Sequence, residues 1–277
     1  MEIYFYYFFV FVMGLFVGSF LNLVADRLVS GESILFGRSH CDFCDNVLKV
    51  ADLIPVFSFV FNKGKCRYCS ERLSVAYPLS EVLTGVIFLL AAVSSGVFGG
   101  APLHSGLNAG LVRSLGSAFG LGFNIYPVLL FAYFLLIFSV YIVIFLADTK
   151  YQIIPNEAIF TGLAVVGVFY VVFGFKSSDV VSAVSLGLFF WFLHAITKGK
   201  GMGFGDVRLA FLIGLFNRFP YNIIAIFSSF VLGSVVSLGL MALGKKGMKD
   251  KIAFGPFMIL GSLLVFVAGD LFLNWYL

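Results

Sequence analysis

The sequence predicts an all-α, polytopic membrane protein with about eight transmembrane helices and one small polar loop. Three observations support this fold class. Apolar residues make up 61% of the 277 residues, charged residues make up only 12%, and the mean hydropathy is +1.05. Soluble domains carry about 25% charged residues, so the composition excludes an ordinary soluble globule. The net charge of +4 implies no nucleic-acid partner, because the orientation of the chain in the lipid bilayer accounts for it.

The apolar residues form eight candidate spans. They lie at residues 3–25, 78–99, 125–147, 157–174, 180–197, 206–219, 221–243 and 252–276. The span at 206–219 is shorter than the roughly 17–25 residues of a straight transmembrane helix, so we expect it to be tilted, buried among other helices or re-entrant. Residues 100–124 are glycine-rich and weakly hydrophobic, which favours an exported loop with a short interfacial helix.

The basic residues give these spans an orientation. Residue 2 is Glu, so the first apolar run lacks the basic start of a cleavable signal and is predicted to be an anchor with its N-terminus outside. The segments then predicted to be cytoplasmic hold 15 of the 18 basic residues, in agreement with the positive-inside rule. We divide the chain into a first transmembrane helix at 1–25, a cytoplasmic loop at 26–77, a second transmembrane helix with an exported loop at 78–124, and a helical core at 125–277.

All four cysteines lie in the cytoplasmic loop, as the pairs Cys41/Cys44 and Cys66/Cys69. Two Cys-x-x-Cys pairs separated by about 20 residues are typical of a tetrahedral zinc site. We favour zinc over disulfides because cytosolic thiols stay reduced. Four thiolates leave no open coordination position, so the predicted zinc is structural. His40 could be a spare ligand, although a solvated loop histidine is the simpler interpretation.

Two aspartates stand at the ends of apolar runs. Asp148 closes the third run, and Asp206 opens the sixth, directly after a glycine-rich segment that contains Gly203 and Gly205. An ionisable residue at a membrane edge is costly and is therefore a candidate functional residue. The predicted orientation places both carboxyl groups on the cytoplasmic side. Two acids that share one proton are the working part of an aspartic protease, and the two glycines would let a substrate backbone or a neighbouring helix approach.

Other interpretations of these carboxylates stay open at this point. Each aspartate could cap a helix or pair with a basic residue two positions further on, Lys150 or Arg208. A proton-coupled transporter with a zinc-binding regulatory loop would also carry membrane acids, but it should show paired half-helices in two repeats, and one short span is visible. A non-catalytic assembly factor is a third class. The absence of an HExxH segment argues against an intramembrane metalloprotease.

Six segments, taken in chain order, resemble the motifs of the bacterial type IV prepilin peptidases, a family of bifunctional leader peptidase/N-methyltransferases and GxGD-type membrane aspartic proteases. They are Gly18 to Asn22 with Arg27; the two cysteine pairs, with Asp52 to Pro55 between them; Tyr77 to Glu81; Asp148 to Pro155; Gly201 to Val207, which contains the GxGD signature; and Phe254 to Phe257. Three positions depart from the family pattern, which usually has Pro at Asp42, Asp at Asn156 and Lys at Arg208. None of these departures removes a candidate carboxylate or thiolate.

The resemblance implies two reactions at the cytoplasmic face of a bacterial inner membrane. The first is cleavage of the leader peptide from prepilin or pseudopilin precursors of type IV pilus or type II secretion systems. Asp148 and Asp206 would be the catalytic pair, and the sequence does not assign which of them is ionised. Gly203 and Gly205 would let the substrate approach.

The second implied reaction is N-methylation of the new N-terminus with S-adenosylmethionine. The resemblance places this reaction in the cytoplasmic loop and the second helix, and it points to Glu81 as a residue of the cofactor site. Glu81 could equally be a helix N-terminal charge that the macrodipole favours. No glycine fingerprint shows where the methyl donor binds.

Overall fold

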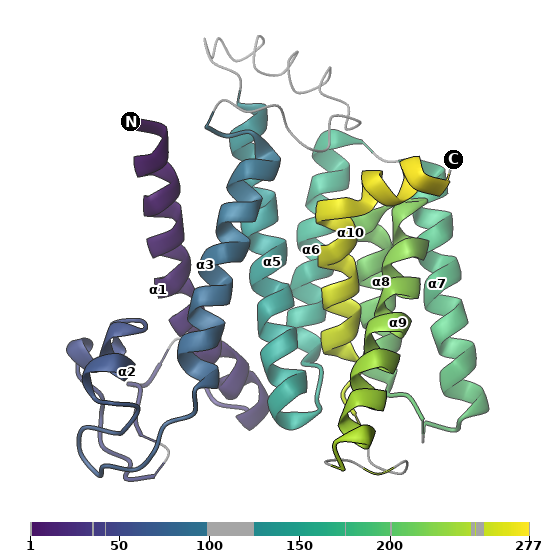
Figure 1. Ribbon diagram of the computed structural model, residues 1–277. Helices are drawn as coiled ribbons and strands as arrows, with labels where there is room; N and C mark the ends of the chain where they lie inside the picture. Colours follow the sequence, from purple (N-terminus) through teal and green to yellow (C-terminus); the bar gives the residue numbers. More distant parts are fainter. Residues whose placement is uncertain are drawn as a thin grey trace. The chain divides into compact units, whose positions relative to one another are not determined.

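The computed structural model describes residues 2–34, 36–41, 43–98, 125–174, 176–199, 201–244, 247 and 252–276. Over these ranges the regular secondary structure is helical, apart from two isolated β-bridges. The elements are α1 (Glu2–Ser30), η1 (Val50–Leu53), α2 (Phe57–Phe61), α3 (Ala76–Ser95), α5 (Tyr126–Tyr151), α6 (Asn156–Phe173), α7 (Ser177–Ile196), α8 (Phe204–Asn217), α9 (Tyr221–Ala242) and α10 (Gly255–Tyr276) (Figure 1). The predicted exported loop at 100–124 lies outside the described residues. The all-α fold class is confirmed.

Seven described helices are long and apolar enough to cross a membrane, namely α1, α3, α5, α6, α7, α9 and α10. The eighth, α8, has 14 residues and is therefore about 21 Å long, which is less than the roughly 30 Å of a bilayer core. It contacts α6, α7, α9 and α10, and its residues Leu209, Leu212 and Ile213 are fully buried. Of the three arrangements that we considered for 206–219, the structure shows a helix buried among other helices.

Two helices extend past the predicted ends of their spans. α1 continues beyond residue 25 to Ser30 and carries Arg27 with it. The guanidinium of Arg27 is buried, and it donates hydrogen bonds to three carbonyl oxygens of the following loop, which offsets the cost of burying its charge. α5 continues beyond residue 147 to Tyr151. Asp148 therefore lies in the last turn of a helix and not in the connection that follows it.

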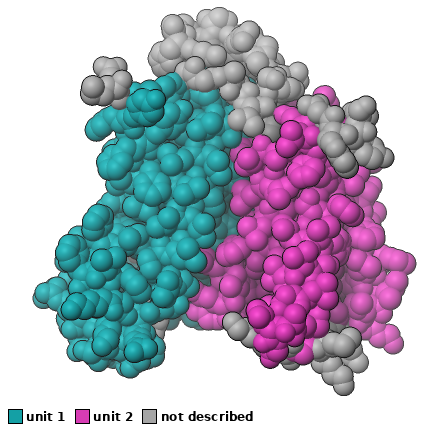
Figure 2. Space-filling model, viewed as in Figure 1, with its two compact units in different colours: residues 1–143 teal, residues 144–277 magenta. Residues whose placement is uncertain are grey.

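The chain forms two compact units, residues 1–143 and 144–277 (Figure 2). In the first unit α1 packs tightly along α3, because glycines bring the two backbones together. A Cβ atom on Gly14 would lie only 2.6 Å from the Cα atom of Gly85, as expected where small residues line a helix crossing. In the second unit the short α8 is surrounded by longer helices. The domain boundaries given above remain a prediction.

Candidate functional site

Asp148 is bound to the first residue of α10. Its side chain is 5% exposed, and Oδ2 accepts a 3.0 Å hydrogen bond from the backbone N–H of Gly255. The N-terminus of a helix has free N–H groups and the positive end of the macrodipole, and both stabilise a carboxylate. A side chain at position 255 would prevent this contact, because a Cβ atom there would lie 2.6 Å from Asp148 Oδ2. Gly255 belongs to the last of the six resembling segments, but no local pattern in the sequence indicates its contact with Asp148.

Asp206 is the third residue of α8, and its own backbone loop holds it in place. Oδ2 accepts a 3.0 Å hydrogen bond from the N–H of Gly203, which satisfies one of the free donors that precede a helix. Gly205 faces the segment between α5 and α6. A Cβ atom on Gly205 would lie 2.9 Å from Cβ of Ile154, whereas one on Gly203 would lie 3.4 Å from Asp206 Oδ2. A side chain at position 205 would therefore clash more severely than one at position 203.

The two aspartates lie at the same end of the second unit. The Cδ1 atom of Ile154 is 3.3 Å from a Cβ atom built on Gly205 and 3.4 Å from one built on Gly255. The first turns of α8 and α10 thus both lie against the side chain of Ile154. Asp148, bound to the first residue of α10, and Asp206, in the first turn of α8, are therefore brought toward one another. A pair of acids in this situation favours a state in which one of them keeps its proton.

Arg208 does not neutralise Asp206. Its guanidinium donates to the side-chain oxygen of Asn156 and lies 4.7 Å from the ring centroid of Phe204. Asn156 and Arg208 are two of the three positions that depart from the family pattern, and the structure joins them in one hydrogen bond. These two departures therefore belong to a single contact between the starts of α6 and α8.

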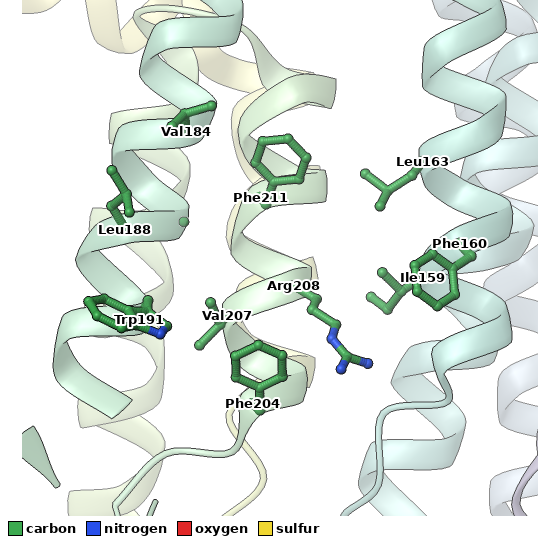
Figure 3. A pocket seen from close by; sticks show the side chains of 11 residues that line it. Ile159, Phe160, Leu163, Val184, Leu188, Trp191, Phe204, Val207, Arg208 and Phe211 are labelled. Atoms are coloured by element: carbon green, nitrogen blue, oxygen red, sulfur yellow. The ribbon is translucent and has the colours of Figure 1, made fainter. Parts of the chain in front are cut away.

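A groove of about 380 Å³ lies between α6, α7 and α8 (Figure 3). Its wall on α8 is formed by Phe204, Val207, Arg208 and Phe211. At 3.6 residues per turn these side chains occupy the face of α8 opposite to Asp206. Neither Asp148 nor Asp206 lines the groove, and its lining is apolar except for Arg208.

The four cysteines come together in the first unit. They are free thiols, and their sulfur atoms all lie within 4.8 Å of one another. Zinc–sulfur bonds of about 2.3 Å in a tetrahedral site place the sulfurs roughly 3.8 Å apart, so the cluster fits a metal ion of this kind. Cys41 and Cys66 are each 5% exposed. These cysteines could bind a metal, as the two pairs predict.

The two cysteine pairs share one backbone conformation. In each, the N–H of the first cysteine donates to the carbonyl five residues further on, and the residue four positions on, Asp45 or Ser70, has a positive φ. This tight turn directs N–H groups at the sulfur, as in the 3.5 Å contact from Tyr68 N to Cys66 Sγ. Backbone N–H groups of Cys69 and Tyr68 lower the pKa of Cys66 to about 7. A lowered pKa favours the thiolate, which is the metal-binding form, whereas burial raises the pKa of Cys41 and the pKa of Cys69 is raised as well.

Asp52 connects η1 to the second cysteine pair. Its carboxylate accepts hydrogen bonds from the N–H of Lys49 at 3.0 Å and the hydroxyl of Tyr68 at 2.9 Å, and it lies 3.7 Å from Arg67. Burial alone would raise the pKa of Asp52, but the bonds from Lys49 and Tyr68 and the charge of Arg67 outweigh it and lower this pKa. The segment that begins at Asp52 is thereby tied to the thiol cluster.

Glu81 connects the same loop to the helix pair α1 and α3. It is 7% exposed, and Oε2 accepts a 2.7 Å hydrogen bond from the N–H of Val56. Val56 has φ 61° and ψ −49°, which is a strained conformation for a β-branched residue. Glu81 lies beyond the first turn of α3, where the macrodipole has little effect, so the helix-terminus interpretation fails. Whether Glu81 also belongs to a cofactor site remains a prediction.

Fold and sites together define a multi-pass membrane protein with a buried Asp148 and a half-buried Asp206 at one end of one unit, and a cluster of four thiols that could bind a metal in the other. Residues 12–95 match the family model of the Bacterial Peptidase A24 N-terminal domain, and residues 134–238 match that of the Type IV leader peptidase family. These matches cover more than half of the chain in the expected order. The chain belongs to the type IV leader peptidase family, which confirms the resemblance that the six segments carry.

Relatives named "Prepilin leader peptidase/N-methyltransferase" are similar over nearly the full length. The protein of Bacillus subtilis (strain 168) is 28% identical over 269 residues, which are 96% of each chain. That of Dichelobacter nodosus is 26% identical, over 95% of this chain and 91% of its own. That of Pseudomonas putida is 25% identical, over 94% of this chain and 89% of its own. No solved structure matches the chain.

Proposed function

We propose that the protein is a membrane aspartic endopeptidase that removes the leader peptide from prepilin-like precursors at the cytoplasmic face of the bacterial inner membrane. The observation that carries the proposal is the placement of Asp148 and Asp206 at one end of the second unit, each bound to the N–H of a glycine at a helix start. The family match supports the activity, and nothing supports the alternative of a transporter.

The hydrogen bonds indicate which oxygen of each aspartate is free to take part in peptide cleavage. Both N–H bonds go to Oδ2 atoms, which leaves Oδ1 of each aspartate to face a water molecule or the scissile carbonyl. The ionised aspartate takes a proton from water, whose oxygen attacks the carbonyl carbon, while the protonated aspartate donates to the carbonyl oxygen. When the tetrahedral intermediate collapses, the C–N bond breaks and a carboxyl group returns the proton to the leaving amine.

Asparagine substitutions test this proposal. Asp148→Asn and Asp206→Asn keep an oxygen that can accept the glycine N–H, so both variants should insert and fold. Each should lower leader cleavage by roughly 10²–10⁴-fold, the usual contribution of an acid or base. Purified protein is mixed with a prepilin, and mass spectrometry follows the loss of the leader. Asp270→Asn, at an exposed carboxylate on α10, is the control. A folded Asp148→Asn or Asp206→Asn protein that cleaves at the wild-type rate would refute the assignment.

We further propose that the first unit N-methylates the new N-terminus, with S-adenosylmethionine as methyl donor. The seam between α1 and α3 holds a carboxylate, Glu81, and one buried acceptor without a hydrogen-bond partner, Oδ1 of Asn22. Negative and acceptor groups suit a donor that carries a positive charge. When bound, the donor supplies the methyl group, and these residues would hold its cationic part. The same mass measurement tests this activity, because a methylated product is heavier by one methyl group and forms only when the donor is added.

The thiol cluster completes the proposal. We assign Cys41, Cys44, Cys66 and Cys69 to a structural zinc ion, because four thiolates fill a tetrahedral site. The loop of 26–77 is otherwise small for a stable core, and Glu81 and Asp52 tie it to α3 and to the second cysteine pair. Zinc would thus shape the loop beside the proposed methyltransferase seam and take no part in peptide cleavage.

A further inference from the structure

We infer that His194 is a positioning residue for Asp206, acting through a single peptide bond. This inference rests on the proposed function, because it assumes that Asp206 takes part in cleavage. The Nδ1 atom of His194 lies 2.8 Å from the carbonyl oxygen of Met202. The N–H of the next residue, Gly203, donates to Oδ2 of Asp206 at 3.0 Å. Carbonyl and N–H belong to the same planar peptide unit, so His194 and Asp206 bind its two opposite sides.

The chemistry of the peptide unit fixes the direction of these bonds. A carbonyl oxygen can only accept, so Nδ1 of His194 carries the hydrogen. An N–H is therefore present at Nδ1 whether the ring is neutral or charged. A hydrogen bond to the carbonyl also polarises the peptide and strengthens the donation from its N–H. His194 thus fixes the plane of the peptide and supports the bond that orients the Asp206 carboxylate.

The surroundings of His194 hold its ring in this orientation. The residue lies in the last turn of α7, and its ring meets Phe204, the first residue of α8, edge to face at 5.6 Å between centroids. Gly199, whose φ is +73°, also lies beside the ring, because a Cβ atom built there would be 3.4 Å from Cε1. The half-buried histidine ring therefore has contacts with Met202, Phe204 and Gly199.

Two amide substitutions separate positioning from simple packing. The side-chain nitrogen of asparagine reaches about the place of histidine Nδ1, whereas that of glutamine reaches the place of Nε2. We expect His194→Ala and His194→Gln to lower kcat for leader cleavage roughly three- to tenfold, the effect of one lost neutral hydrogen bond. KM should change little, because the contact is to the enzyme and not to the substrate. His194→Asn should restore most of kcat. Ile196→Ala, at an exposed position about half a turn away on the same helix, is the matched control.

The outcomes of this experiment are distinct. A wild-type kcat in folded His194→Ala overturns the inference. Equal losses in the alanine, glutamine and asparagine variants overturn it as well, since they would show that only the ring matters. If the alanine variant fails to fold, the comparison of asparagine with glutamine still decides. Asp206→Asn is measured beside them: an active Asp206→Asn protein refutes the proposed function and the inference together, whereas an inactive one with a fully active His194→Ala refutes the inference alone.

Discussion

Replacing Gly255 by alanine should displace the Asp148 carboxylate and slow cleavage, although Asp148 itself is not substituted. The added Cβ atom would lie 2.6 Å from Asp148 Oδ2, which is about 0.8 Å closer than the 3.4 Å at which ordinary van der Waals contact begins. The new Cβ atom is bonded to the backbone and cannot move away. The Asp148 carboxylate must therefore move, and its 3.0 Å hydrogen bond from the Gly255 N–H must lengthen. A misplacement of about 1 Å in a catalytic group can cost roughly 10²-fold in rate, or about 2.7 kcal/mol of transition-state stabilisation.

The assay is single-turnover cleavage of a purified prepilin, read by mass spectrometry, with thermal unfolding measured on the same samples. Gly239→Ala is the matched control, because nothing lies within 4 Å of a Cβ atom built at that helix position. We expect the control to cleave normally and Gly255→Ala to cleave roughly 10²-fold more slowly while it stays folded. A folded Gly255→Ala protein with at least half of the wild-type rate would show that the position of Asp148 against α10 does not matter for cleavage.

Three further predictions follow from the same contacts. Gly205→Ala should slow cleavage more than Gly203→Ala, because the new Cβ atom would lie 2.9 Å from a neighbour in the first case and 3.4 Å in the second; single-turnover rates of the two variants decide this. Glu81→Ala should reduce methylation but not cleavage, and it should lower stability by about 1.5–3 kcal/mol through loss of the bond to Val56. Glu81→Gln keeps an acceptor and should regain the stability, so methylation that returns as well would rule out a role for the charge. Cys66→Ser should reduce bound zinc well below one ion per chain and speed proteolysis of the loop with little effect on cleavage, as read by metal analysis and timed digestion.

The spans and the cysteine pairs could be predicted because their signals are local. A run of about 20 apolar residues identifies a membrane helix without reference to the rest of the chain. Two short cysteine spacings indicate a metal site because each spacing fixes one turn. Asp148 and Asp206 were also recognisable, since each is an acid at the edge of an apolar run. What they do in the protein is still a proposal, although the structure brings them to one end of the same unit.

The partners of these residues could not be predicted, because they lie far away in the chain. Gly255 is 107 positions from Asp148, and no local pattern reports such a distance. Arg208 was considered as a partner of Asp206, two residues away, but its bond goes to Asn156, 52 positions away. The role of His194 depends on the path of the turn after α7, which hydropathy does not describe. Tertiary contacts decide these assignments.

The short length of α8 has a consequence for how the protein is made. A segment of 14 residues is too short to partition from the translocon into lipid by itself. It fits tightly against the preceding helix, because a Cβ atom on Gly214 would lie 2.8 Å from the Cα atom of Ala183. We therefore expect α7 and α8 to leave the insertion machinery as one hairpin during synthesis. Asp206 would then reach its place only when the ribosome has completed both helices, so the second acid of the pair arrives late in biogenesis.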